Sequence, residues 1–196
     1  MRIIRKKGAS DVRFRHSTVP TPTQAQELEM QALYLQGSDG EASTENLVFS
    51  EQFVLWALRL WSNGGSEIPA VQERLRGGFE LAGAPDAYLG FDALMTFTES
   101  LLDVEVEIHC PQCQYLCGNE IRVLAAISAM QRDDVDTFKA MMSDWMASDA
   151  VWQLAPVYAE FASSLTTSGL TLRQWLVSVE GDDGDGLYQT EGRMIQ

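Results

Sequence analysis

The chain has 196 residues, of which 45% are hydrophobic and 21% are charged, the balance of an ordinary globular protein, so disorder of the whole chain is excluded. Its formal net charge is −14, and because residues 1–16 carry a local balance of +5, the remaining 180 residues carry −19. So negative a body repels phosphate backbones, which argues against nucleic-acid binding by the globular part. No segment approaches the roughly 20 uninterrupted apolar residues that a membrane span requires, and no apolar signal segment follows the basic N-terminus. We therefore expect a cytoplasmic protein that does not enter a membrane.

The polar ends of the chain and its apolar middle predict three parts. Residues 1–18 are predicted to form a flexible basic arm, which can contact an anionic partner or the acidic body of the same chain. Residues 19–179 carry the apolar periodicity and are predicted to form one helical domain. Residues 180–196 open with an acidic, glycine-rich run and are predicted to form a flexible tail.

Apolar residues recur at a spacing near 3.6 through most of the middle part, which predicts an all-α fold of about seven helices. In the N-terminal half, the predicted helices span about 22–36, 43–62, 69–81 and 85–102. Their ends fall at clusters of Gly, Asn, Ser and Asp, the residues that stop helices and form turns.

The C-terminal half is predicted to continue with a helix over about 119–131, capped by Asn119, and with another that Asp133 caps. Pro156 is predicted to start or to kink the next helix, because proline lacks a backbone N–H group, and Gly169 is predicted to end it. A short last helix is predicted over about 171–179.

The segment 103–108 departs from this pattern. Its β-branched residues alternate strictly with acidic ones, which predicts a short strand, although an extended connector has the same pattern. A strand needs a partner, and no second strand is evident in the sequence. Pairing across a two-fold axis would supply one, so the strand and the many apolar helix faces together predict self-association.

The segment 109–117 holds all three cysteines and one of the two histidines of the chain. Thiolates two and three residues apart around a proline turn can converge on one ion, so Cys110, Cys113 and Cys117, with His109, are predicted to bind zinc. His109 and Cys110 are adjacent, and neighbouring side chains of an extended segment point apart. The fourth ligand would therefore come more readily from His16, a carboxylate, water or a second subunit.

Two other interpretations of the same segment remain open. Cys110-Pro111-Gln112-Cys113 resembles the Cys-Pro-Tyr-Cys motif of glutaredoxins, which implies a reactive thiol at Cys110 or Cys113, but the strand and helix order of that fold is absent. Alternatively, the three cysteines are small apolar residues packed in a turn, where they have no chemical role.

From about 91 to 175 the chain resembles a group of small uncharacterised bacterial proteins, chiefly proteobacterial. Three features carry the resemblance: a Leu-rich helix before Ile108-His109, the cysteine turn before Asn119-Glu120, and the run Val123-Leu124-Ala125-Ala126 that leads to Gln131-Arg132-Asp133. The resemblance implies a helical fold and no particular activity.

The sequence contains no Gly-rich phosphate loop, GxSxG elbow or HExxH motif. The leading hypothesis is a non-enzymatic helical binding or regulatory protein, with a protein partner or a second copy of itself, whose cysteine turn is structural or holds a metal. The alternative is a thiol-based redox enzyme or sensor that uses Cys110 and Cys113. The sequence does not indicate a small-molecule ligand.

Overall fold

The computed structural model describes residues 2–4 and 43–175. The predicted helix over 22–36, most of the predicted arm and the predicted tail lie outside these residues. The described part contains six α-helices, the short 3-10 helices η1 (Thr44–Asn46) and η2 (Gly65–Glu67), and one pair of short strands. This confirms the predicted all-α fold. None of the described helices combines the length and apolar character needed to cross a bilayer.

Most of the predicted helices are present within about one turn of their predicted bounds. In chain order they are α2 (Phe49–Ser62), α3 (Pro69–Leu81), α4 (Ala87–Leu101), α5 (Gly118–Met130), α6 (Val135–Met142) and α7 (Ser148–Thr167). One exception is α2, which begins six residues after the predicted start at 43, where η1 takes the place of its first turn. The other is α7, which begins eight residues before Pro156, so the proline lies inside the helix rather than at its start. Proline has no N–H group to donate to the carbonyl of Trp152, four residues earlier in the helix. Both residues are exposed, so water can replace that hydrogen bond.

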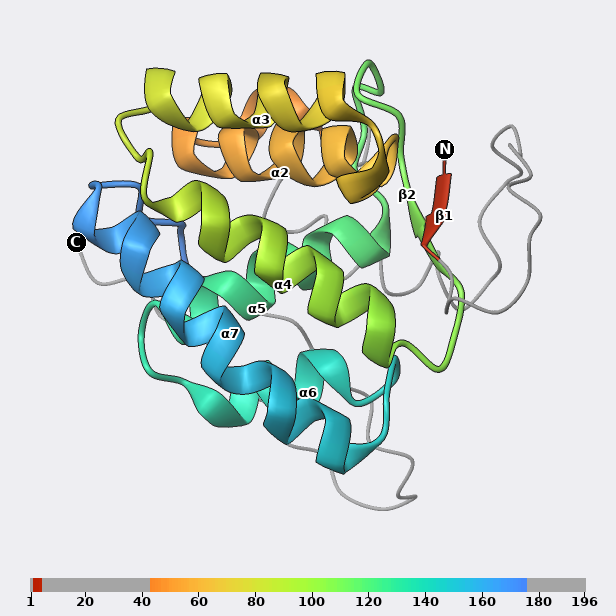
Figure 1. Ribbon diagram of the computed structural model, residues 1–196. Helices are drawn as coiled ribbons and strands as arrows, with labels where there is room; N and C mark the ends of the chain where they lie inside the picture. The colour runs from red at the N-terminus through yellow and green to blue at the C-terminus, as the bar shows by residue number, and fades with distance from the viewer. Residues whose placement is uncertain (1, 5–42, 176–196) are drawn as a thin grey trace.

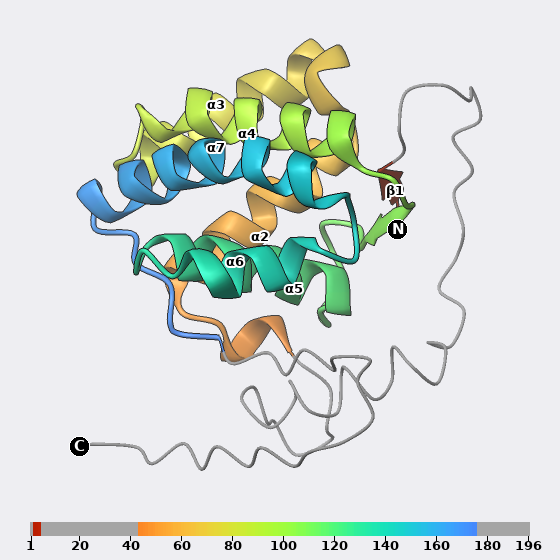
Figure 2. The same cartoon turned by 90° about the horizontal axis from the view of Figure 1, so that it is seen from below.

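The helices pack in two layers around one core. The closest pairs are α4 with α7 and α5 with α6, and α5 also packs against α7 (Figures 1 and 2). α2 contacts both α3 and α5, and so links the layers. Phe79 lies at the centre of an aromatic cluster, in edge-on contact with Phe53 and Phe161 and tilted against Phe91. These rings are contributed by four helices, which explains why the layers form a single core.

α2 and α3 approach closely at one glycine. A Cβ atom added to Gly78 would lie 2.4 Å from the ring of Trp56, so only a residue without a side chain allows this contact. The neighbouring Gly77 has nothing within 4 Å of the same position. Gly78 therefore sets where the Trp56 indole lies on the surface of α2.

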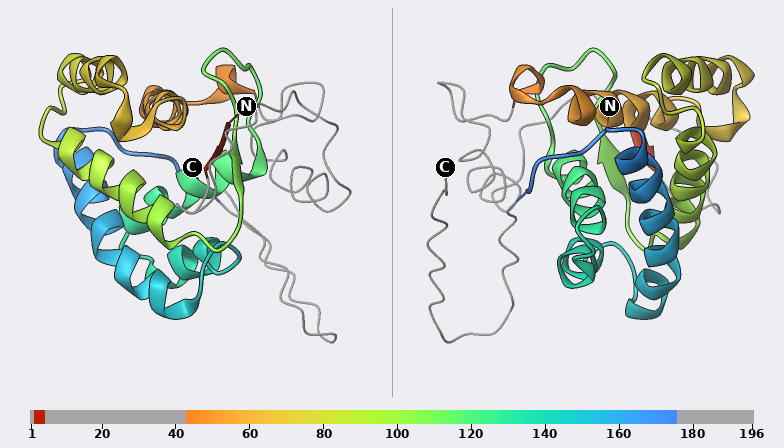
Figure 3. Two further views of the ribbon diagram at one scale, coloured as in Figure 1. Left: turned by 45° about the vertical axis from the view of Figure 1, so that its right-hand side comes forward. Right: turned by 90° about the vertical axis from the view of Figure 1, so that its left-hand side faces the viewer.

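The predicted strand is present but shorter, and its partner comes from the same chain. β2 (Val106–Ile108) pairs antiparallel with β1 (Arg2–Ile4), with Arg2 opposite Ile108 (Figures 1 and 3). Residues 2–4 thus belong to a strand, where the sequence predicted a flexible arm. Because β2 is paired within the chain, it gives no argument for pairing across a two-fold axis.

The predicted last helix is wrong over its described part, 171–175, which has no helical structure. Gly169, at φ +77°, ends α7, and the chain then extends past α5 and α2 towards η1 (Figure 2). Side chains at those two helices bind its backbone: Gln131, directly after α5, bonds to Leu170 and Leu172, and Ser50 of α2 donates to the carbonyl of Thr171. These bonds replace the helical ones that the local sequence favours.

Candidate functional site

The loop 109–117 is held by a buried ion pair between two helices. Arg59, near the end of α2, binds Glu120, in the first turn of α5, through two parallel hydrogen bonds. The Nε–Oε1 distance is 2.8 Å and the Nη2–Oε2 distance is 2.9 Å. The side chains are only 3% and 0% exposed, so each charge depends on the other for compensation.

Both members of the pair also bind the backbone of the loop. Arg59 donates from Nη1 to the carbonyl of Cys113 at 2.6 Å, and from Nη2 to that of Tyr115 at 2.7 Å. Glu120 accepts the backbone N–H groups of His109 and Cys117, each at 3.0 Å. The pair thus fixes the loop at four points and joins it to α2 and α5.

These contacts correct the predicted cap of α5. Cys117 is the N-cap residue, and Glu120 three positions later accepts its N–H, as in a capping box. The predicted cap, Asn119, lies inside the first turn and donates from its side chain to the carbonyl of Glu107.

Opposing effects act on the pKa of Arg59. Burial is the largest effect and lowers it, but the hydrogen bond and the negative charge of Glu120 outweigh burial, with further contributions from Cys113 and Cys117. The net pKa is raised above the ordinary arginine value. Arg59 therefore stays charged.

The three thiols differ in their surroundings. Burial of the Cys117 thiol, and next the charge of Glu120, raise its pKa well above the ordinary value. Its Sγ donates to the carbonyl of Glu107 at 3.4 Å. Cys117 is therefore a protonated, hydrogen-bonded thiol at neutral pH. Cys110 and Cys113, both half-buried, form the first and fourth positions of a turn that the Cys113 N–H closes on the Cys110 carbonyl at 3.1 Å.

The structure brings only two of the four predicted zinc ligands together. Ligand atoms of His109, Cys117 and Glu120 lie within 4.8 Å of one another, whereas Cys110 and Cys113 do not belong to this group of described residues. Sequence reasoning did not include Glu120.

Two of the three residues of this group already use their donor atoms in hydrogen bonds. His109 Nδ1 lies 2.9 Å from the Tyr115 carbonyl, which can only accept, so Nδ1 carries hydrogen and the lone pair of the ring lies on Nε2. Glu120 accepts four hydrogen bonds, and the Cys117 thiol keeps its proton. A zinc ion bound by these atoms would have to displace Arg59 from its carboxylate. In the observed arrangement the Glu120 carboxylate therefore serves Arg59 and the loop rather than a metal ion.

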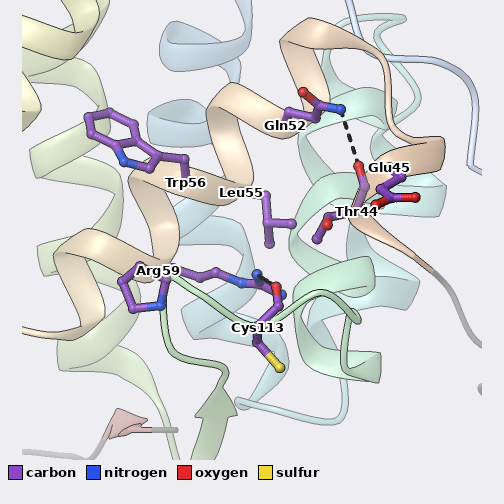
Figure 4. Close-up of a pocket in the computed structure, with 8 residues that line it drawn as sticks. Thr44, Glu45, Gln52, Leu55, Trp56, Arg59 and Cys113 are labelled. Atoms are coloured by element: carbon purple, nitrogen blue, oxygen red, sulfur yellow. Dashed lines mark hydrogen bonds between the residues drawn. The ribbon is translucent and has the colours of Figure 1, made fainter.

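A pocket of about 240 Å³ lies between η1, α2 and the loop, and we call it the α2 groove (Figure 4). The backbone N–H of Thr44 donates to the carbonyl of Gln114 at 2.8 Å, which ties η1 to the loop. Gln52 donates from α2 to the carbonyl of Thr44 at 3.2 Å, so the three walls are joined to one another. The lining residues are Thr44, Glu45, Gln52, Leu55, Trp56, Arg59, Pro111 and Cys113.

Sequence reasoning missed most of this groove. The indole of Trp56 is only partly buried and lines the pocket. Arg59 was not considered, although it is the one charged residue in the second half of α2. A single charge at a buried helical position is a signal for a buried partner. The partner itself, 61 residues away, has no local signal.

No family model matches the chain, and no curated protein or solved structure matches it significantly. The resemblance to a bacterial family remains a prediction.

Proposed function

We propose that this protein is a non-enzymatic binding protein and that the α2 groove takes a short segment of a protein partner. The observation that carries the proposal is the Arg59–Glu120 pair, which joins the loop to α2 and so holds both walls of the groove in place. A preformed site avoids the ordering cost of binding.

The size of the groove supports a side-chain ligand. Pockets for drug-sized molecules and cofactors occupy about 300–1,000 Å³, whereas this one occupies about 240 Å³. That volume suits one or two side chains of a partner.

The lining supports a basic segment. Glu45 is exposed at the edge of the groove, and the Trp56 indole offers an aromatic face. Arg59, the other charge, is already neutralised by Glu120. A lysine or arginine side chain can stack on an indole while a nearby carboxylate compensates its charge. The charge of −19 on residues 17–196 attracts such a segment over a longer range.

The same contacts support a structural role for the loop residues rather than a catalytic one. His109 is engaged through Nδ1, and Cys117 is held protonated. We also propose a cytoplasmic location, because three free cysteines suit a reducing compartment.

The test is a titration of the full chain with a panel of ten-residue peptides, each with one Lys or Arg between apolar residues. The same peptides with Glu at that position are the negative set. We expect the basic peptides to bind and to shift the indole resonance of Trp56. Trp56→Ala should weaken binding at least tenfold, whereas Trp152→Ala, which removes an exposed tryptophan of α7, should leave it unchanged. Equal binding by the two variants, or by the Glu peptides, contradicts the proposal.

A further inference from the structure

The turn 110–113 places two cysteines within disulfide reach. The hydrogen bond from Cys113 N to Cys110 O, at 3.1 Å, closes the turn with Pro111 and Gln112 at its corners. The first and fourth Cα atoms of such a turn lie within about 7 Å, and a disulfide joins Cα atoms about 4.4–6.8 Å apart. A bond between Cys110 and Cys113 therefore needs only a small adjustment of the loop.

The third cysteine is held apart from this pair. The Cys117 thiol donates to the Glu107 carbonyl, on the side of the loop next to β2. Burial keeps it protonated, and a thiol must ionise to react. Oxidation should therefore select the pair in the turn.

The turn is also fixed from outside. Arg59 Nη1 donates to the Cys113 carbonyl at 2.6 Å, and this contact involves backbone rather than sulfur. The bond between the two sulfurs can thus form and break without releasing the loop from α2.

We propose that Cys110 and Cys113 are a reversible oxidation site, with a peroxide as oxidant and a dithiol as reductant. One thiolate attacks an oxygen of hydrogen peroxide; the O–O bond breaks, hydroxide leaves, and a sulfenic acid forms. The second thiolate attacks the sulfenic sulfur; the S–O bond breaks and hydroxide leaves. With the two thiol protons, both hydroxides become water, so two thiols and one peroxide give one disulfide and two waters. A dithiol reverses the reaction by exchange and is itself oxidised.

Cys113 also lines the α2 groove, so oxidation changes the chemistry of one groove wall. This consequence rests on the proposed binding function, whereas formation of the disulfide does not. In the oxidised protein, we expect the affinity for basic peptides to change at least threefold.

The experiment uses the full wild-type chain, treated with equimolar hydrogen peroxide, then denatured and treated with an alkylating agent so that every remaining thiol reacts. Peptide mass spectrometry should show the loss of two of the three thiols, a bond that joins Cys110 to Cys113, and an alkylated Cys117. Excess dithiothreitol should restore all three thiols. Cys117→Ser should lose two thiols as the wild type does, whereas Cys110→Ser should form no disulfide within the chain.

A bond that includes Cys117, bonds only between chains, or no disulfide at all overturns the proposal. Because the first measurement uses wild-type protein, a variant that fails to fold does not affect the result. If the disulfide forms and no basic peptide binds, the oxidation site stands and the proposed binding function fails.

Discussion

The carboxylate of Glu51, at the start of α2, binds Arg173, which lies 122 residues later in the chain and beyond the end of α7. The carboxylate is 0% exposed, whereas the arginine side chain is 45% exposed. Glu51 accepts the N–H groups of both Val48 and Arg173 in addition to the guanidinium. One buried acid thus caps α2 and anchors the C-terminal extended segment.

Arg173→Ala leaves Glu51 buried without its cation. Because the arginine is partly solvated, we expect a loss of about 2 kcal/mol of unfolding free energy, below the range for fully buried pairs. Urea denaturation measures it. Gln174→Ala, at the next and exposed position, is the control and should change stability by less than about 0.5 kcal/mol. Equal losses in both variants would show that the ion pair does not anchor the segment.

Arg59→Met leaves Glu120 without a cation inside the protein. We expect the unfolding free energy to fall by about 3–5 kcal/mol, because the remaining charge stays buried and its desolvation is no longer compensated. Arg122→Ala, in the same helix as Glu120, removes a pair with Asp144, whose side chain is 61% exposed, and a hydrogen bond to the Met141 carbonyl, and should cost less, about 1–2 kcal/mol. Adding Glu120→Leu to Arg59→Met should recover part of the loss. A double variant that loses the sum of both single effects would contradict this coupling.

Gly78→Ala places a methyl group 2.4 Å from the Trp56 ring. We expect a destabilisation of about 1–3 kcal/mol from overpacking, together with displacement of the indole that lines the α2 groove. Gly77→Ala has open space and should instead stabilise α3 by up to about 1 kcal/mol. Thermal unfolding and tryptophan fluorescence test the pair. The same sign for both substitutions would refute the close approach of α2 and α3.

The raised pKa of Cys117 makes stability depend on pH in a defined direction. In the unfolded chain this thiol ionises near its ordinary value of 9.0, whereas in the folded protein it keeps its proton. The unfolded state therefore binds fewer protons above about pH 9, and stability falls as the pH rises, by at most about 1.4 kcal/mol per pH unit. Below pH 8 this contribution is constant. Cys117→Ala should remove the fall, so the difference between the two proteins from pH 8 to 10 isolates it; parallel curves would count against the raised pKa.

The Glu120 carboxylate is bound to Arg59 and the Cys117 thiol donates to a carbonyl, so we expect purified protein to contain well under one zinc per chain. A chelator should leave the melting temperature unchanged, and Cys113→Ser should cost no more than an ordinary polar substitution. Elemental analysis and thermal unfolding measure these quantities. If the protein instead contains one zinc per chain, and Cys113→Ser or Glu120→Gln loses it, the zinc interpretation is supported and the hydrogen-bonded arrangement is contradicted.

The sequence alone predicted the class of the fold and most of its helices. The bounds of α3, α4 and α5 and the end of α2 follow from apolar spacing and from capping and turn residues, all of which act within a few positions of each other. The cysteine turn was also evident locally, because its proline and its spacing are properties of four consecutive residues. Such features depend only on residues close together in the sequence.

Only the tertiary structure decided the remaining features. Nothing near Val106 indicates that its partner is Ile4, and nothing near Arg59 indicates Glu120. The segment after Gly169 has helical spacing, yet the buried side chains of Ser50 in α2 and Ser128 in α5 bind its backbone, and these bonds override the local preference. A buried charge needs a compensating group, and the packing of the helices determines which group lies close enough to compensate it. That packing depends on the fold of the whole chain.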